Sequence, residues 1–499
     1  VEAMTLEEVN KAASKYLIPS NRTIGRFHPT KDPERVAIPH VANLDSLVSG
    51  YKGKESKGTG EAFDVAYDKI EERLQRGELD NGIKYGFIEK SNRGATVTFN
   101  FSIRNGDVKS LSNKGMIPSF TAAMLNKGTT NMTRQEIEDE LSRLKSSVNL
   151  YARNGNTYAS IESTEENLQE VVKLMIDMIK NPAFEPSELE KIKTERLANL
   201  ENNKTEPQFL ASQRLGEINN TFPKGHPNYT MTIEEQEAAI KAVTVEDIRK
   251  FHDEFYGLGK SILVSIGDQD VDQLKSMMQE AFTGFESDHP YSEIKNPFQA
   301  NKPVHEDIQT PDKQNAMTLG GQSINISEYH EDYAALTIAS TILGGGFLNS
   351  RIADRLRQKD GVSYGAGAGF QADSDKDDSN SRMFIYAIYA PANYDKVQLG
   401  FKEEIARFIA DGITEEELKD AINGWVQGRT VSRAKDNELA SLVNNNIYYD
   451  RDMEFHKSIE DKVTSLTVEE VNAAIKKYIK PFTEWTVVNA GDFKKEGTE

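Results

Sequence analysis

The feature that most limits the fold of this chain is a pattern that occurs three times. Each copy opens with a threonine and has an acidic residue three places later, continues as a helical run, and leads into an extended segment; the copies begin at Thr5, Thr244 and Thr467. This threonine and acid spacing is the capping box that starts a helix, and β-branched residues favour strands. The pattern therefore predicts a helix and strand that recur at the end of a structural unit.

The second and third copies each stand at the end of a segment of domain size, residues 58–268 and 305–492. The first copy has no such segment before it. Residues 1–30 are therefore predicted to be the terminal helix and strand of a preceding unit, which makes this chain the later part of a longer polypeptide. A free-standing amino-terminal helix and strand is the alternative. Residues 31–70 contain two prolines and a run, 49–60, in which almost nothing can be buried, so they are predicted to be a linker.

After the linker, residues 71–285 and 286–499 are predicted to form two related units. In the first, residues 95–103 alternate between apolar and polar side chains as a strand does, and residues 382–389 do the same in the second. Helices with capping signals follow the strands in both units. Patterning alone thus predicts two mixed repeats of helices and strands.

The composition excludes several classes of function. A formal charge of −19, with no long basic stripe to offset it, argues against nucleic acids and anionic membranes as partners. The chain has no cysteine, so it has neither disulfides nor thiolate metal sites. No run approaches the roughly 18 apolar residues of a membrane span. We expect a soluble protein, and the sequence does not decide between periplasm and cytoplasm.

Three patterns that would suggest a cofactor fail on spacing. The eight histidines contain no pair three or four residues apart, so no helix presents two imidazoles to one metal. The glycines of residues 344–346 and 365–369 match no phosphate-binding motif and are interpreted as close backbone approaches. Residues 373–381 hold four aspartates but lack the glycine and distal glutamate of a calcium loop, and they are interpreted as a solvated surface loop.

Residues 115–129 are the stretch around which the first unit is organised, and they are predicted to be a helix with a glycine stop at Gly128. Their surroundings, at residues 81–85, 106–115 and 124–129, resemble the insulinase/pitrilysin family of zinc metallopeptidases. Members of that family, also called inverzincins, carry an H-x-x-E-H motif on a helix at this place.

The resemblance implies that the metal motif is degraded here. Aligned without a gap, Ser119 and Ala123 stand where the family has its two histidine ligands, and Ala122 stands where it has the general-base glutamate. Asn199, counted back from Pro207, replaces the glutamate that is the third ligand. A catalytic zinc needs three protein ligands and a water, and that water needs a carboxylate to take its proton. We therefore expect no zinc and no catalytic residue in this chain; zinc is expected in the missing amino-terminal half.

The segment 350–364 resembles the signature of the family's non-catalytic half. In that signature an arginine on a helix and a tyrosine seven residues later reach across the chamber to the peptide substrate, and the corresponding residues here are Arg357 and Tyr364. A guanidinium and a phenol O–H both donate hydrogen bonds, which suits a peptide carbonyl that is becoming an oxyanion. The structural alternative is an arginine in a surface ion pair and a tyrosine in the core.

The resemblance covers nearly the whole chain. It implies an α+β fold of two related units, each a largely antiparallel sheet with helices packed on one face. The implied function is the carboxy-terminal half of a zinc-dependent metalloendopeptidase, which encloses and binds the peptide but is inactive alone. Its partners would be the amino-terminal catalytic half, in the same polypeptide or a separate chain, and the peptide substrate. The alternative is a non-enzymatic peptide-binding or scaffold subunit with the same fold.

Overall fold

The structure is a computed structural model that describes residues 5–18, 20, 22–26, 60–153, 155–346 and 349–493. The chain divides into two units, Val1–Ser56 and Lys57–Glu499. The first unit contains helix α1 (Leu6–Tyr16), which starts with the predicted capping box. The Glu8 N–H donates to Thr5 Oγ1 at 3.3 Å, and Glu8 Oε2 accepts from the Thr5 N–H at 2.8 Å.

The strand predicted after this helix is not seen in residues 22–26. A strand needs a partner to complete its hydrogen-bond ladder, and the described residues of the unit Val1–Ser56 contain no strand. The end of that predicted strand and the linker up to residue 59 lie outside the described residues. The last residues assigned to the linker belong to helix α3 (Tyr67–Arg73), in which Tyr67 and Ile70 are buried.

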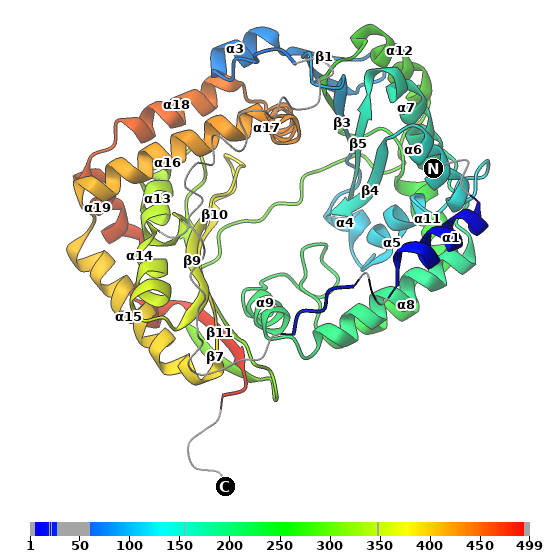
Figure 1. The fold of residues 1–499 in the computed structure, drawn as a ribbon. Coiled ribbons are helices and arrows are strands. Elements are labelled where there is room, and N and C mark those ends of the chain that lie inside the picture. The colour runs from blue at the N-terminus through cyan, green and yellow to red at the C-terminus, as the bar shows by residue number, and fades with distance from the viewer. Residues whose placement is uncertain are drawn as a thin grey trace. The chain divides into compact units, whose positions relative to one another are not determined.

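The second unit, Lys57–Glu499, contains two mixed sheets (Figure 1). In the first sheet only β2 and β6 pair in parallel, and all other neighbours are antiparallel. Its strands, in spatial order, are β1 (Gln75–Glu78), β2 (Lys84–Glu89), β6 (Ile262–Gly267), β3 (Thr96–Ile103), β5 (Asn156–Thr164) and β4 (Ser147–Arg153).

The second sheet repeats this plan with five strands. Again a single pair, β11 with β7, is parallel. Its strands, in spatial order, are β7 (Val304–Gln309), β11 (Thr486–Gly491), β8 (Ala316–Asn325), β10 (Asn380–Tyr389) and β9 (Ser363–Gln371). The prediction of an α+β fold built from two related, largely antiparallel sheets is confirmed.

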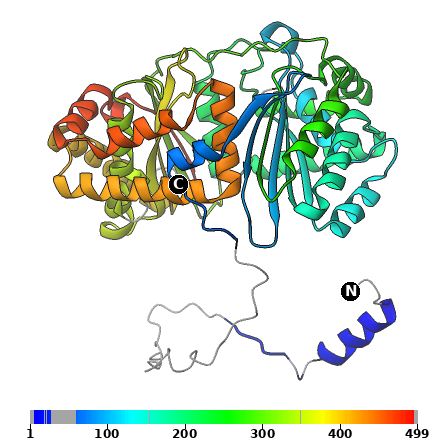
Figure 2. The ribbon, with the colours of Figure 1, turned by 90° about the horizontal axis from the view of Figure 1, so that it is seen from above.

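Each sheet together with its helices is called one half of this unit. Most helices pack on the outer face of a sheet, as Figures 1 and 2 show, and a few pack on an inner face. The helices of the first half are α3, α4 (Val108–Leu111), α5 (Ile117–Leu125), α6 (Arg134–Arg143), α7 (Glu165–Lys180), α8 (Pro186–Asn203), α9 (Pro207–Ile218), α10 (Ile233–Ala242), α11 (Val245–Phe255) and α12 (Val271–Phe282). Those of the second half are α13 (Tyr333–Ser340), the π-helical η2 (Thr341–Gly345) and η4 (Asp354–Lys359), α14 (Arg351–Ala353), α15 (Tyr394–Asp411), α16 (Glu415–Ala434), α17 (Asp436–Tyr449), α18 (Met453–Thr464) and α19 (Val468–Tyr478), with short 3-10 turns η5 (Pro391–Asn393) and η6 (Phe482–Glu484).

The recurring helix and strand occupy the same place in both halves. Helix α11 leads into β6, and α19 leads into β11; each helix has the predicted capping box, with Thr244 and Thr467 as N-caps. Each of these strands lies between a parallel and an antiparallel neighbour and is buried along its whole length. A strand that is flanked on both sides and covered on both faces is mostly apolar, which explains its β-branched composition. The buried polar exceptions in the two strands are Ser265, Thr486 and Asn489.

Two helices cross from one half to the other and hold the halves together. Helix α9 packs its Ala211 and Leu215 against Met317 and Val488 on the inner face of the second sheet. Conversely, α17 of the second half packs on the first sheet. Its residues Leu439, Ala440 and Val443 lie against Ile262, Val264 and Ile266. The inner faces are therefore covered at one side of each sheet and left open at the other.

The glycines of the second half allow the close approach that the sequence predicts. A Cβ on Gly344 would lie 1.9 Å from the backbone nitrogen of Ala368, and a Cβ on Gly367 would lie 2.8 Å from the Gly344 carbonyl oxygen. Neither is a normal contact distance, so η2 can rest directly on β9 only with glycine at both positions.

Candidate functional site

Helix α5 contains the residues that the sequence analysis predicts to be a degraded metal motif. Phe120, Thr121 and Ala122 are completely buried, whereas Ser119 and Ala123 are half-buried. The helix packs on β4 and α11. Pro118 lies in the first turn, where the missing N–H costs no hydrogen bond. The residues predicted to replace the two histidine ligands therefore lie on the partly covered face of α5, and the residue predicted to replace the general base is buried.

An arginine that the sequence analysis did not single out occupies this face. Arg196 of α8 donates from Nη1 to Ser119 Oγ at 3.0 Å and from Nη2 to the Ser119 carbonyl oxygen at 3.1 Å. Its guanidinium lies 4.0 Å from the centre of the Phe120 ring, a favourable stacking of cation on aromatic ring. Ser119 Oγ in turn donates to the Met116 carbonyl oxygen at 2.9 Å. Burial lowers the pKa of Arg196 from its usual value, which is high enough that the group stays charged at neutral pH.

These residues do not fit a zinc ion. Ala122 and Ala123 have no lone pair, the hydroxyl of Ser119 already makes two hydrogen bonds, and Asn199 is exposed on α8. The positive guanidinium of Arg196 opposes a second cation at the same place. In the part of the chain that the structure describes, no cluster of three or more histidine, aspartate or glutamate side chains is arranged to hold a metal.

A cavity of about 380 Å³ opens beside Ser119. Its mouth is polar, because Lys224 forms an ion pair with Glu235 at 2.6 Å and the Tyr229 hydroxyl donates to the same carboxylate at 3.0 Å. Its walls are largely apolar and include Leu111, Pro118, Ala152, Pro227, Met231, Ala238 and Ala239. Such a cavity suits a small apolar side chain.

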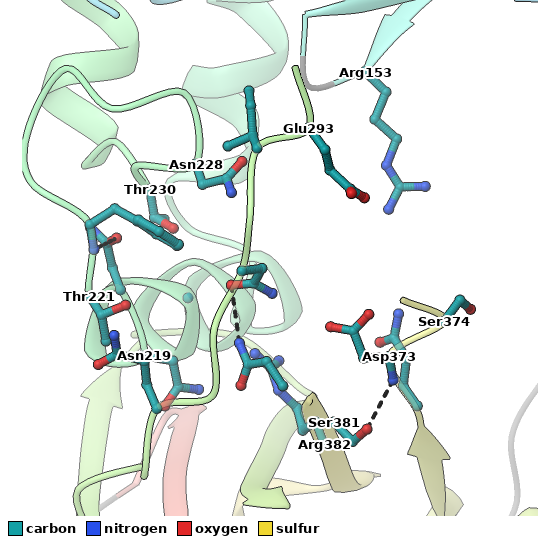
Figure 3. Close-up of a pocket in the computed structure, with 18 of the residues that line it drawn as sticks. Arg153, Asn219, Thr221, Asn228, Thr230, Glu293, Asp373, Ser374, Ser381 and Arg382 are labelled. Carbon is teal, nitrogen blue, oxygen red and sulfur yellow. Dashed lines mark hydrogen bonds between the residues drawn. The ribbon is translucent and has the colours of Figure 1, made fainter. Parts of the chain in front are cut away.

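A larger cavity of about 800 Å³ lies between the open inner faces of the two sheets. Its lining comes from the β4–β5 and β9–β10 ends, from the segment after α9, and from residues 291–302 between the halves. Figure 3 shows Arg153 and Glu293 with their charged ends directed into the open space, across from Asp373. Asparagine, glutamine and serine side chains make up much of the remaining wall. The cavity is thus polar and is built by both halves.

The predicted substrate residues Arg357 and Tyr364 lie outside both of these cavities. Arg357 is exposed near the end of the π-helical turn η4. Tyr364 is 84 % exposed on the edge strand β9. It has no partner in the register, because Ser363 pairs with Tyr389 and Gly365 with Ile388, and a bulge of this kind redirects a side chain. The tyrosine is therefore not a core residue, and the role of the pair stays a prediction.

The aspartate loop differs from the sequence interpretation. Asp375 and Asp378 are only 7 % and 8 % exposed, so residues 373–381 are not simply a solvated loop. Lys295 pairs with Asp375 at 2.6 Å, and the Asn296 N–H donates to Asp378 at 2.9 Å. The interpretation failed because the covering residues come from the irregular segment between the halves, which carries no sequence pattern.

Arg382 is another residue of the candidate site that the sequence analysis did not identify. It stands on β10 with its side chain open to the larger cavity. Its aliphatic part passes over Gly321 of β8, where a Cβ would come within 3.5 Å of Arg382 Cδ. The signal was available, because strict alternation through residues 382–389 places Arg382 on the face opposite the buried Met383 and Ile385.

None of the described helices has the length and apolar character needed to cross a membrane.

Comparison with known proteins agrees with this architecture. Residues 88–228 match the family model for Insulinase (Peptidase family M16), and residues 242–424 match the model for the Peptidase M16 inactive domain. The chain is 21% identical to the Non-peptidase homolog YmxG of Helicobacter pylori over 75% of its own length and 84% of that protein. It is 23% identical to the bovine Cytochrome b-c1 complex subunit 1, mitochondrial, over 54% of this chain and 55% of that protein.

Solved structures share the fold. The peptidase M16 inactive domain from Pseudomonas fluorescens superimposes with a TM-score of 0.73 at 21% identity, covering 85% of this chain and 99% of that one. The periplasmic protease PqqL from Escherichia coli gives a TM-score of 0.67 at 15% identity and covers 98% of this chain but 51% of that one. This chain belongs to the insulinase family, peptidase family M16, and carries both the amino-terminal domain and the carboxy-terminal inactive domain of that family.

Proposed function

We propose that this chain is the peptide-binding, non-catalytic half of a two-half zinc metalloendopeptidase. The observation that carries the proposal is the contact of Arg196 with Ser119. Ser119 is the residue predicted to stand at a metal-ligand position of the family's motif, so its hydrogen bonds with a cationic side chain support a site without a metal. A chain that keeps the peptidase fold and a polar cavity between its halves, but has neither metal ligands nor a base, is suited to bind a peptide without cleaving it.

The catalytic partner in this proposal is an amino-terminal half with an intact H-x-x-E-H motif, in the same polypeptide or a separate chain. The likeness to PqqL supports it, because nearly all of this chain superimposes on about half of that protease. The zinc and the general base would belong to that half. The present chain would close the chamber and present substrate-binding groups.

In this arrangement Arg357 and Tyr364 would donate hydrogen bonds to the peptide carbonyl that is attacked. Their exposure supports the assignment, since neither side chain is buried in its own half. The π-helical turn that carries Arg357 supports it as well, because such turns are frequent at functional sites.

A scaffold subunit without any peptidase role is the second candidate. The names of two relatives favour it, one being called a non-peptidase homolog and the other a subunit of the cytochrome b-c1 complex. The sequence of the partner half distinguishes the two functions. An intact H-x-x-E-H motif there fits the peptidase, and a second degraded motif fits the scaffold.

The test combines binding and turnover. The chain alone, with zinc added, is expected to bind a fluorescently labelled unstructured peptide and to leave it uncut. When the catalytic half is added, cleavage should appear, and Tyr364→Phe or Arg357→Ala should lower turnover about 100-fold, as loss of one oxyanion donor does. Arg134→Ala, an exposed arginine of α6, is the control that should change nothing. Hydrolysis and stoichiometric zinc binding by the chain alone would overturn the proposal.

A further inference from the structure

The larger cavity has a charge opposite to that of the chain as a whole. Among the described residues that line it, four are basic and two are acidic, a formal balance of +2; they are Arg104, Arg153, Lys302, Arg382, Glu293 and Asp373. The chain carries a net charge of −19. An excess of one sign of charge on the walls of a cavity raises the local concentration of ligands of the other sign. The interior therefore favours anionic groups although the protein is acidic.

The two acidic groups already have partners. Glu293 accepts from Lys295 at 3.0 Å and from the Tyr448 hydroxyl at 3.2 Å. The Asp373 carboxylate accepts from the Asp375 N–H at 3.0 Å. Burial, followed by the neighbouring Asp378 and Asp375, raises the pKa of Asp373. Neither carboxylate forms an ion pair with an arginine of the cavity.

The arginines differ in how they are engaged. Arg104 is held in place, because it donates to Ser102 Oγ at 2.8 Å and lies 4.5 Å from the centre of the Tyr448 ring. In contrast, the side chains of Arg382 and Arg153 make no hydrogen bond or ion pair with any residue that the structure describes. Arg382 faces the cavity from the second sheet, and Arg153 faces it from the end of β4 in the first.

The environment of the Arg382 guanidinium favours the binding of an anion. The surrounding protein lowers its pKa by partial desolvation, and no acidic neighbour compensates. A charged guanidinium that has lost part of its hydration and has no counter-ion gains most from a carboxylate, which it can bind through two parallel hydrogen bonds.

We propose that this cavity selects peptides that carry carboxylates, with Arg382 as the main anchor and Arg153 as the second. This inference rests on the proposed peptide-binding function and adds a substrate class to it, acidic peptides. The carboxylate can belong to glutamate or aspartate side chains or to the peptide's carboxy terminus. The amide side chains of the wall, such as Asn228 and Gln371, are placed to pair with the peptide backbone.

The experiment compares matched labelled peptides by fluorescence anisotropy on the full chain. One peptide carries several glutamates, the second has glutamines in their place, and each is made with a free and an amidated carboxy terminus. We expect the glutamate or free-acid peptide to bind about 10-fold more tightly than its neutral counterpart, corresponding to about 1.4 kcal/mol. The difference should shrink as salt is added.

The variants Arg382→Gln and Arg153→Gln should each remove most of this preference, because each should weaken binding of the acidic peptide more than binding of the neutral one. Arg382→Lys keeps the charge and should keep part of the preference, and Arg134→Gln on α6 is the matched surface control. Thermal unfolding verifies that the variants fold. Equal binding of acidic and neutral peptides by the wild type, or a preference unchanged in both glutamine variants, overturns the inference while the peptide-binding function stands. Absence of binding by every peptide overturns both.

Discussion

Arg196 donates two hydrogen bonds to Ser119, one to the side-chain oxygen and one to the main-chain oxygen. The sequence analysis predicts that the serine is the first position of a degraded metal motif, and the arginine lies one turn before Asn199 on α8. If that prediction holds, the site lacks its ligands and also contains a fixed positive charge. Restoring the ligands alone would place a metal ion against that charge.

This relationship predicts that the metal site can be rebuilt only if Arg196 is removed. A chain with the three ligands restored, Ser119→His, Ala123→His and Asn199→Glu, should bind zinc weakly. Adding Arg196→Ala should tighten zinc binding at least about 10-fold, since it removes the repulsion and frees space on the helix face. Isothermal titration calorimetry with zinc measures both. Arg134→Ala in place of Arg196→Ala should give no gain, and tight stoichiometric binding with Arg196 intact would contradict the prediction.

The packing of α17 on β2 predicts a sensitive glycine. A Cβ on Gly86 would lie 2.7 Å from Val443 Cγ1 and 2.9 Å from Ile447 Cδ1. Gly86→Ala should therefore push α17 away from the first sheet and lower the free energy of unfolding by about 1–3 kcal/mol, the usual cost of overpacking.

A matched control for this change is Gly424→Ala. Gly424 lies in the exposed face of α16 with nothing within 4 Å of an added Cβ, and alanine is the better helix former. Denaturant unfolding of both variants should show a loss for Gly86→Ala and no loss for Gly424→Ala. Equal stability of the two variants would mean that α17 does not press on β2 as described.

The packing of α9 on the second sheet predicts that Leu215 contributes more to the stability of the fold than its sequence neighbour Arg214. Leu215 is 7 % exposed and packs on Met317 and Val488, so Leu215→Ala should cost about 2–5 kcal/mol. Arg214 pairs with Glu306 at 2.9 Å, but its side chain is 42% exposed, and Arg214→Ala should cost less than about 1 kcal/mol. Thermal unfolding of the two variants tests this order, and a larger loss for Arg214→Ala would reverse it.

Sequence patterns predicted the features that depend on local order. The capping boxes at Thr244 and Thr467 start the observed helices, and alternation located β3 and β10. In each case the deciding interaction lies within a few residues or within one strand. The close backbone approach of the glycines at residues 344–346 and 365–369 was also predicted, and Gly344 and Gly367 make it although they lie far apart in the sequence.

The features that patterns missed depend on residues far apart in the chain. Arg196 belongs to the charged helix α8, and its partner Ser119 is 77 positions away in the sequence. The burial of Asp375 depends on Lys295, 80 positions away, in a segment without helix or strand. Only the fold brings such residues together, because no local pattern of either partner depends on the other.

Buried His456 predicts a pH dependence of stability. The side chain is 7 % exposed on α18, and its Nε2 lies 2.7 Å from Asn446 Oδ1. Arg429 Nη2 lies 3.5 Å from its Nδ1. The neutral tautomer with the proton on Nε2 satisfies both contacts. Burial, followed by the charges of Arg429, Arg451 and Arg433, lowers the pKa of His456 to about 3.

Because this pKa lies below its unfolded value of about 6.5, His456 binds a proton in the unfolded chain at pH values where it stays neutral in the folded chain. The contribution of His456 to stability is therefore complete above about pH 6.5 and is lost as the pH falls towards 3, by at most about 1.4 kcal/mol per pH unit. His456→Gln, which keeps a donor towards Asn446, should flatten the pH dependence of the unfolding free energy in this window relative to the wild type. The matched change His330→Gln should leave the wild-type slope, and an unchanged slope in His456→Gln would show that other groups cause it.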